Sequence, residues 1–470
     1  MIDQIKFGTD GWRAVIGDKY TVNNVARVAA GTALWVKKQS NEPVIVIGHD
    51  CRFNGKLFME TAIKVYLHYG IKVFYADGFV STPMVSMGAK KYDANIGVVL
   101  TASHNPPSYG GYKLKSNFGG PLLPDKIQEV EDLIPEHVAP EIMSYDLDVA
   151  LKEKQLVQID LETEYIDAVK KNFDVESIEK SGLNLAFDAM YGSGQNVLKP
   201  LFPNMHFLHC EHNPGFKGQA PEPIAKNLKE LEAFIKKNGS IDAALATDGD
   251  ADRIGLFGKE GEFIDSHHII LLLIHYMVKY KKMTGKVITA FSCSPKIAKM
   301  CEHYGLAHKT VKIGFKHIAG YMIEEDVLLG GEESGGIATK GHIPERDGIW
   351  MGMIIWEFMA KSGKSLASLI DEVYEIVGAF KFERSDLHID EVLKQEIINN
   401  CKDNVYTSFG NYKVEKVETI DGFKFYLPND AWVMIRPSGT EPVLRIYAEA
   451  HDLEEVRKIL KTTESTITQK

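Results

Sequence analysis

The chain has 470 residues and a formal net charge of −10, and its 44% hydrophobic and 25% charged residues are typical of a globular protein. At roughly 100–200 residues per domain, this length predicts three or four domains. The negative charge argues against nucleic acid or an anionic membrane as a partner, because both need basic surfaces. The five cysteines are scattered and include no C-x-x-C pair, which argues against a disulfide framework and against a cysteine zinc site.

Two features of the chain predict a cytoplasmic location. The first residues lack the apolar segment of a signal peptide. The longest apolar run, residues 267–278, is far shorter than a membrane span and predicts a buried helix.

Strand-like and helix-like segments alternate over most of the chain. Helical patterns lie at residues 23–38 and 228–239. Strand patterns lie at residues 43–50, 71–79, 94–103, 183–190, 241–250, 253–258, 286–292 and 326–331. This alternation predicts α/β units in which helices pack on sheets.

The C-terminal part has a different order of elements. A helix at residues 391–401 is followed by strands at 412–419, 423–427, 432–437 and 443–450, and then by a helix from residue 453. This order predicts a small α+β domain with an antiparallel sheet. We therefore expect four domains, at residues 1–158, 159–260, 261–376 and 377–470.

The first of four polar loops spans residues 101–107, TASHNPP, directly after an apolar strand. Pro106 and Pro107 stop the strand and stiffen the turn, so Ser103 is held at the carboxyl end of a strand. Ser103 is a candidate nucleophile or phosphate carrier, and an ordinary polar turn is the alternative. A serine hydrolase is disfavoured because the G-x-S-x-G pattern is absent. His104 is expected to be a poor base for Ser103, because neighbours on an extended segment point to opposite faces.

The second loop carries three alternating carboxylates, Asp248, Asp250 and Asp252, between two apolar strands. Residues at i, i+2 and i+4 fall on one side of an extended segment, where unpaired carboxylates repel one another. A divalent cation is the simplest remedy, and oxygen ligands favour Mg²⁺ or Ca²⁺. A solvated acidic turn is the alternative. The segment fits neither an EF-hand nor the D-x-D-x-[TV] pattern of haloacid dehalogenases.

Two further loops carry groups that suit sugar and phosphate binding. The loop GGEESGG, residues 330–336, offers Glu332 and Ser334 to sugar hydroxyls, although a plain glycine turn is the alternative. The loop RPSGT, residues 436–440, combines a guanidinium, two hydroxyls and backbone N–H groups into a candidate phosphate cradle. An ordinary hairpin turn is the alternative there. The segment YGSG, residues 191–194, lacks the full G-x-G-x-x-G pattern and predicts a tight strand-to-helix turn.

Together and in this order, the motifs T-A-S-H-N-P, D-G-D-A-D-R, G-E-E-S-G and R-P-S-G-T-E-P resemble the four signature loops of the α-D-phosphohexomutase superfamily. The resemblance extends from F-G-T-D-G at residues 7–11 to the last strands. It implies three similar α/β domains with mixed sheets around a central cleft, and a C-terminal α+β domain. Each domain would supply one loop.

The resemblance also implies a role for each loop. Ser103 would carry the transferable phosphate and would bind Mg²⁺ together with Asp248, Asp250 and Asp252. The catalytic groups beside the phosphoserine would be Arg13, Lys113 and His104, with Lys113 a candidate proton shuttle. The substrate-binding residues would be Arg253, Gly314, Lys316, Glu332 and Ser334, together with Arg436, Ser438, Gly439 and Thr440, which would hold the non-reacting phosphate.

The implied reaction interconverts a hexose 1-phosphate and a hexose 6-phosphate. Phosphoryl transfer needs positioning and charge neutralisation, which these loops can supply. The intermediate, a hexose 1,6-bisphosphate and here glucose 1,6-bisphosphate, would also act as an activator.

Two segments favour glucose as the sugar. G-F-K at residues 314–316 and G-H-I-P-E-R-D-G at residues 341–348 resemble segments of phosphoglucomutases. Gly335-Gly336 replaces the G-H that is common in bacterial phosphomannomutases and phosphoglucosamine mutases. Glucose phosphate is therefore the predicted substrate, with phosphomannomutase or phosphoglucosamine mutase activity as the alternative. A non-catalytic sugar-phosphate-binding relative is disfavoured because Ser103 and the three aspartates are all present.

Overall fold

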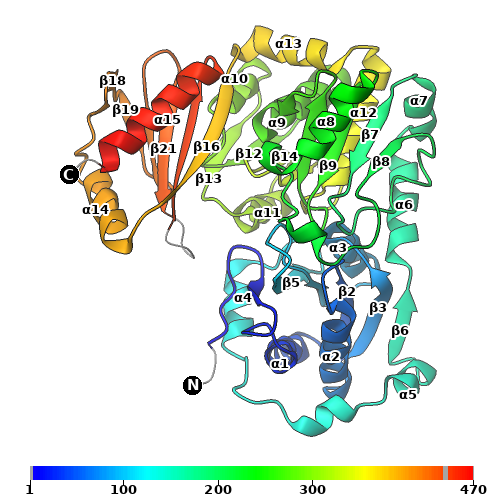
Figure 1. The fold of residues 1–470 in the computed structure, drawn as a ribbon. Coiled ribbons are helices and arrows are strands. Elements are labelled where there is room, and N and C mark those ends of the chain that lie inside the picture. Colours follow the sequence, from blue (N-terminus) through cyan, green and yellow to red (C-terminus); the bar gives the residue numbers. More distant parts are fainter. Residues whose placement is uncertain (1–3, 438–442, 469–470) are drawn as a thin grey trace. The chain divides into compact units, whose positions relative to one another are not determined.

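The computed structural model describes residues 4–437 and 443–468 (Figure 1). The chain divides into two compact units. The first comprises Met1–Ile288 and Gly314–Ile370, and the second comprises Thr289–Ile313 and Asp371–Lys470. This division groups the chain differently from the four predicted domains, whose boundaries stay predictions.

A six-stranded mixed sheet forms the N-terminal part of the first unit, in the order β1-β5-β4-β2-β3-β6. The strands β4, β2, β3 and β6 are parallel, whereas β5 and β1 are antiparallel to their neighbours. Apolar faces of this sheet and its helices share one core, in which Val28, Ile47 and Val98 are fully buried. The elements are β1 (Trp12–Val15), α1 (Val22–Gln39), β2 (Val44–His49), α2 (Gly55–His68), β3 (Lys72–Phe79), α3 (Thr82–Lys91), β4 (Ile96–Leu100), β5 (Tyr109–Ser116), α4 (Pro124–Glu131), the 3-10 turn η1 (Pro140–Ser144), α5 (Leu147–Lys152) and β6 (Leu156–Ile159).

A second, five-stranded mixed sheet has the order β11-β10-β9-β7-β8. The strands β9 and β10 form an antiparallel hairpin. The predicted helix after residue 194 is wrong, because turns occupy residues 190–201 there. The elements are α6 (Leu161–Asn172), α7 (Val175–Lys180), β7 (Leu185–Asp188), β8 (His206–Leu208), the 3-10 turns η2 (Phe216–Gly218) and η3 (Ala225–Asn227), α8 (Lys229–Asn238), β9 (Ala243–Thr247), β10 (Ile254–Gly258) and β11 (Phe263–Ile264).

The predicted buried helix is confirmed as α9 (Ser266–His275), in which every residue is buried. After it come a π-helical turn η4 (Tyr276–Tyr280), β12 (Lys286–Ala290), α10 (Lys296–His303), β13 (His308–Val311), α11 (Phe315–Glu324), β14 (Val327–Gly331), β15 (Ile337–Thr339), α12 (Gly348–Ser362) and α13 (Leu366–Val377). The antiparallel pair β14 and β15 belongs to the first unit. The segments β12 and α13 each cross the sequence boundary between the two units.

The second unit contains a five-stranded antiparallel sheet in the order β16-β22-β21-β20-β19. Phe425, Val433 and Ile446 of this sheet are fully buried, in one core with Ile459 of the last helix. The elements are β16 (Lys381–His388), α14 (Glu391–Lys402), β17 (Ser408–Phe409), β18 (Tyr412–Lys413), β19 (Lys416–Glu418), β20 (Phe423–Tyr426), β21 (Trp432–Pro437), β22 (Val443–Ala450) and α15 (Leu453–Thr468).

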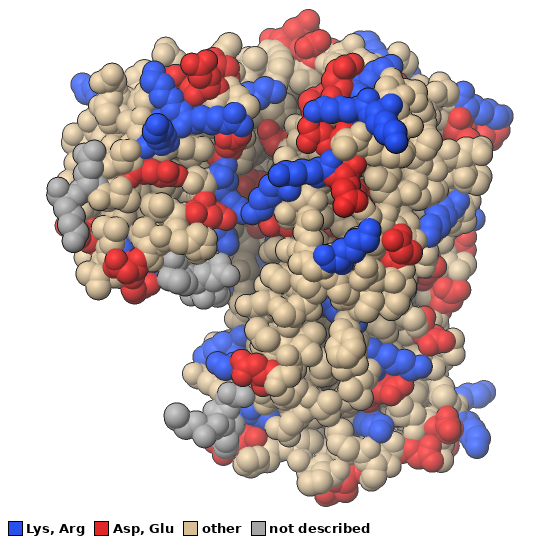
Figure 2. Space-filling model, viewed as in Figure 1, with Lys and Arg blue, Asp and Glu red and all other residues tan. Residues whose placement is uncertain are grey.

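Over the described part of the chain, no helix has both the length and the apolar character needed to cross a membrane. On the face that Figure 2 shows, basic and acidic side chains are interspersed.

Candidate active site

Ser103 lies in the turn that follows β4, which ends at Leu100. Its φ of +51° is in the left-handed region, and only 1% of its surface is exposed. Its Oγ donates a hydrogen bond to Asp248 Oδ2 at 2.7 Å. The first and second predicted loops therefore meet at this hydroxyl.

His104 lies closer to Ser103 than the sequence suggested. Its Nδ1 is 3.4 Å from Ser103 Oγ. The expectation of opposite faces is wrong, because it assumed an extended segment and Ser103 is left-handed. Burial, together with the nearby charges of Arg253 and Arg13, holds the pKa of His104 well below its usual range. The ring is therefore uncharged near neutral pH.

The three aspartates converge at the turn between β9 and β10. One carboxylate oxygen from each of Asp248, Asp250 and Asp252 lies within 4.8 Å of the others, and all three side chains are fully buried. They do not converge on an extended segment, as predicted, but on a tight turn in which Ala251 has a φ of +57°. A turn brings the carboxylates closer than the pleat of a strand would.

The ammonium of Lys113, on β5, neutralises part of this negative charge. Its Nζ lies 2.7 Å from an oxygen of Asp250, 2.8 Å from one of Asp252 and 2.9 Å from one of Asp10. Burial alone would lower the pKa of Lys113, but these three carboxylates raise it well above its usual range. In this arrangement Lys113 keeps its proton. A role in balancing the negative charge therefore suits Lys113 better than the predicted role of proton shuttle.

The three carboxylates differ in how far nearby positive charge offsets the effect of their burial. Burial would raise the pKa of Asp250, but the Lys113 ammonium outweighs burial and holds it below its usual range. Burial and the charges of Asp250 and Asp252 instead raise the pKa of Asp248 well above normal. Asp250 Oδ1 and Asp252 Oδ1 are buried and have no hydrogen-bond partner within the described part of the chain. Uncompensated buried oxygens of this kind suit a hard divalent cation, so the three aspartates fit a metal ion.

The third predicted loop joins β14 to β15 and packs on the hairpin of β9 and β10, which carries the three aspartates. Burial raises the pKa of Glu332 to about 7, and its Oε1 accepts a hydrogen bond from the Gly314 backbone at 3.0 Å. The Gly335 carbonyl accepts the Ile254 N–H at 3.1 Å. A methyl group on Gly336 would lie 2.5 Å from Arg346 Cδ. Arg346 thus leaves no room for a larger side chain at position 336, which accounts for the glycine there.

The other predicted residues of this loop region are more open. Ser334 is half-buried, and so is Lys316 in the first turn of α11. Gly314 has a φ of +121°, and a methyl group on it would lie 2.7 Å from the Thr9 side chain. Gly314 thus allows the F-G-T-D-G segment to approach α11.

Arg346 is a central residue that sequence patterns did not single out. Arg346 is 4% exposed, and its guanidinium bonds the Asp10 carboxylate and lies 2.7 Å from Asp252 Oδ2. It also lies 3.9 Å from Glu332 Oε2. Its neighbour Asp347 caps α12 through the Trp350 N–H at 3.0 Å, which fixes the start of the helix. The only sequence signal was the resemblance of residues 341–348, which pointed to sugar choice.

The two predicted arginines of the first unit have different surroundings. Arg13 Nη1 donates to Asn105 Oδ1 at 2.5 Å, so it contacts the Ser103 loop. The Arg253 backbone N–H donates to Asp248 Oδ1 at 3.1 Å, and its guanidinium lies 3.7 Å from Glu222. Arg253 Nε is buried and finds no hydrogen-bond partner among residues 4–437 and 443–468.

The fourth predicted loop belongs to the second unit. Arg436 lies at the end of β21, and its Nε is 3.4 Å from Asp421 Oδ1. Ser438, Gly439 and Thr440 lie outside the described residues.

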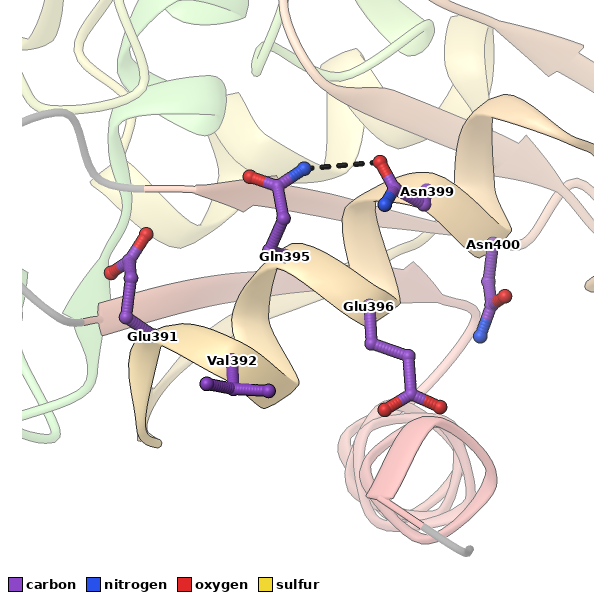
Figure 3. Close-up of a pocket in the computed structure, with 6 residues that line it drawn as sticks. All are labelled: Glu391, Val392, Gln395, Glu396, Asn399 and Asn400. Carbon is purple, nitrogen blue, oxygen red and sulfur yellow. Dashed lines mark hydrogen bonds between the residues drawn. The ribbon is translucent and has the colours of Figure 1, made fainter.

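The second unit also has a groove of about 670 Å³ along α14, lined by Glu391, Val392, Gln395, Glu396, Asn399 and Asn400 (Figure 3). Gln395 donates to Asn399, one turn further along the same helix, at 3.0 Å. This groove contains none of the predicted site residues.

Comparison with known proteins identifies the family. Four models of the phosphoglucomutase/phosphomannomutase family match: α/β/α domain I at residues 4–140, domain II at 163–261, domain III at 265–377 and the C-terminal domain at 391–464. A phosphoglucomutase/phosphomannomutase of Thermococcus kodakarensis is 30% identical over 465 residues, covering 97% of this chain and 96% of that protein. The chain belongs to the α-D-phosphohexomutase superfamily. It is a phosphohexomutase, an isomerase that transfers phosphate within a sugar phosphate, and the predicted class of three α/β domains and a C-terminal domain is confirmed.

Other relatives bear on the sugar that this phosphohexomutase uses. A phosphoglucosamine/phosphogalactosamine mutase of Sulfurisphaera tokodaii is 29% identical, covering 97% of this chain and 99% of that protein. A solved structure from Thermus thermophilus, provisionally named a phosphomannomutase, has a TM-score of 0.87 and 30% identity, with full coverage of both chains. The predicted preference for glucose is not confirmed, because these names fit the alternative better.

The three buried carboxylates generate a prediction for metal binding. A ligand present at 100 times its dissociation constant stabilises the folded state by about 2.7 kcal/mol. We therefore expect Mg²⁺ to raise the melting temperature of the unmodified protein. Asp250→Asn should abolish this shift, because it removes one ligand charge while keeping the side-chain shape.

The matched control is Asp174→Asn, which makes the same change at the exposed cap of α7. It should keep the full shift, as measured by thermal unfolding with and without Mg²⁺. A full shift in Asp250→Asn would show that the aspartates do not hold the ion.

Proposed function

We propose that this phosphohexomutase interconverts hexose 1-phosphate and hexose 6-phosphate through a phosphate carried by Ser103. The sugar hydroxyl attacks the phosphorus, a new O–P bond forms, and the bond to Ser103 Oγ breaks. The hydroxyl loses its proton as it attacks, and the departing Ser103 Oγ gains one, so that the serine hydroxyl is restored. The product of this step is a hexose 1,6-bisphosphate. After it reorients, its other phosphate returns to Ser103 and the monophosphate isomer is released.

One observation carries this proposal: the Ser103 hydroxyl lies 2.7 Å from Asp248 at the edge of the buried aspartate cluster. The cluster is flanked by the fixed charge of Lys113, and Arg13 contacts the loop that holds Ser103. A phosphate on Ser103 would therefore lie beside both a candidate cation site and basic side chains. Phosphoryl transfer relies on this kind of positioning and charge neutralisation.

Asp248, Asp250 and Asp252 are the residues that would hold Mg²⁺, together with the phosphate on Ser103. When bound, the ion would withdraw charge from the transferring phosphoryl group. The chain's own contribution is to fix the Ser103 side chain against Asp248 and to exclude water from the cluster, since these groups are almost fully buried.

The remaining groups are proposed to hold the rest of the substrate. Glu332 and Ser334 would bind sugar hydroxyls beside Arg346, with Arg253, Gly314 and Lys316 nearby. The loop that begins at Arg436 and includes Ser438, Gly439 and Thr440 would hold the non-reacting phosphate. A hexose 1,6-bisphosphate would act as the activator, because it can phosphorylate Ser103 directly. The cytoplasmic location stays a prediction.

The choice of sugar follows from the relatives' names. The names phosphoglucosamine/phosphogalactosamine mutase and phosphomannomutase support an amino-sugar or mannose phosphate as the preferred substrate. The name phosphoglucomutase/phosphomannomutase covers both glucose and mannose. Glu332 and Ser334 are the side chains of the loop that would distinguish these sugars.

Ser103→Ala tests the mechanism. The purified protein should carry the mass of one phosphoryl group on Ser103 after incubation with hexose 1,6-bisphosphate, and the variant should lose both this phosphate and turnover. Ser108→Ala, an exposed serine in the same loop, is the matched control and should keep both. Normal turnover by Ser103→Ala would refute the mechanism. Absence of both phosphate and turnover in the unmodified protein would favour a non-catalytic sugar-phosphate-binding protein.

The sugar preference is tested by kcat/KM for the 1-phosphates of glucosamine, mannose and glucose. We expect either glucosamine or mannose 1-phosphate to exceed glucose 1-phosphate by roughly 10-fold or more, which is the discrimination that a few pocket contacts provide. A clear preference for glucose 1-phosphate would restore the prediction made from residues 314–316 and 341–348.

A further inference from the structure

Arg52 holds the main chain of the Ser103 loop through both of its terminal nitrogens. Its Nη2 donates to the carbonyls of Ser103 and Asn105, each at 2.6 Å. Its Nη1 donates to the carbonyls of Pro106 at 2.8 Å and Tyr109 at 3.1 Å. Nothing in the four signature motifs pointed to this residue, which follows β2.

The guanidinium is itself held in place. Its Nε donates to Asp50 Oδ2 at 3.2 Å, and its central carbon lies 5.0 Å from the centre of the Phe216 ring. Only 5% of Arg52 is exposed. Asp50 also accepts the Thr101 hydroxyl at 2.5 Å, and Thr101 Oγ1 accepts the Ser103 N–H at 2.9 Å. The Ser103 carbonyl is thus bound by Arg52, and the Ser103 N–H is linked through Thr101 to Asp50, the partner of Arg52 in the ion pair.

These contacts control where the Ser103 hydroxyl points. Ser103 is left-handed, a conformation that residues with a side chain adopt only when their surroundings impose it. Its carbonyl is bound by Arg52 and its N–H by Thr101, so neither peptide plane can rotate freely. The Oγ is thereby directed at Asp248.

We propose that Arg52 is a positioning residue for phosphoryl transfer: by binding the carbonyls of residues 103–109, it keeps Ser103 Oγ directed at the aspartate cluster. This inference rests on the proposed function. In the described part of the chain, the hydrogen bonds of the Arg52 side chain go to Asp50 and to the carbonyls of the loop, not to the aspartate cluster, so its effect passes through the loop. Lysine cannot replace it, because an ammonium is a compact group with three donors and lacks the planar fork that reaches four carbonyls.

The test compares Arg52→Lys with Arg27→Lys. Arg27 is equally buried at 5% exposure, lies in α1 of the same sheet domain and also donates to a backbone carbonyl, that of Pro135 at 2.9 Å. A purely structural effect should therefore be similar in the two variants. We expect Arg52→Lys to lower kcat, and the rate of Ser103 phosphorylation by hexose 1,6-bisphosphate, by about 100-fold, as misplacement of a reacting group by about 1 Å does. The KM should change little, because the substrate contacts remain.

In Arg27→Lys, kcat should stay near that of the unmodified protein. Equal kcat in the two variants would overturn the inference. If Arg52→Lys does not fold, Asp50→Asn provides the second test, because it keeps Arg52 and weakens its anchor. It should lower kcat with KM little changed, and an unchanged kcat would again overturn the inference.

Amide hydrogen exchange tests whether Arg52 holds the loop, independently of the proposed function. Residues 103–109 should exchange faster in Arg52→Lys than in Arg27→Lys, whether or not the protein turns over substrate. Equal exchange would contradict the inference even in an active enzyme. An unmodified protein without phosphate on Ser103 and without turnover would refute the proposed function, while faster exchange would still support the loop-holding role of Arg52.

Discussion

The buried ammonium of Lys113, with the guanidinium of Arg346 beside it, holds together the charges on which the site depends. It lies within 2.9 Å of carboxylates from Asp10, Asp250 and Asp252, which otherwise would repel one another in a water-poor interior. Breaking such a buried pair leaves an unpaired charge and typically costs about 3–5 kcal/mol. The balance is still incomplete, because burial and its neighbours raise the pKa of Asp248 well above its usual range, and two carboxylate oxygens have no hydrogen-bond partner among the described residues. A phosphate on Ser103 would add further negative charge, which is the physical reason why a divalent cation fits here.

Main-chain hydrogen bonds link the aspartate turn to the segments on either side of it. The Gly348 N–H donates to the Ala251 carbonyl at 3.0 Å, so the start of α12 rests on the aspartate turn. The Gly335 carbonyl binds Ile254 at the other side of the same turn. Glycine allows these close approaches, since a methyl group on Gly348 would lie 2.2 Å from the Arg253 carbonyl. The aspartate turn, the start of α12 and the loop of residues 330–336 therefore keep their spacing through main-chain contacts.

Much of this arrangement could be predicted from sequence, because strands with strong apolar patterns end in conspicuous polar loops. The strand before Ser103, the hairpin that carries the aspartates and the buried helix α9 follow directly from local pattern. Local pattern could not reveal the left-handed backbone of Ser103 and Ala251, which surrounding contacts impose and which neither residue type favours. For that reason the expected separation of His104 from Ser103 was wrong. Arg52 and Arg346 were missed because their partners lie far away in the chain: Arg346 bonds Asp10, and the two are 336 positions apart.

The most direct test of the account is to follow a labelled phosphate through Ser103. The protein would be mixed with radiolabelled hexose 1,6-bisphosphate and Mg²⁺, quenched within one turnover, and digested to locate the label. The account predicts label on the peptide that contains Ser103, and its transfer to the sugar when unlabelled hexose monophosphate is added. Label on a different residue, or label on Ser103 that remains there after the monophosphate is added, would contradict it.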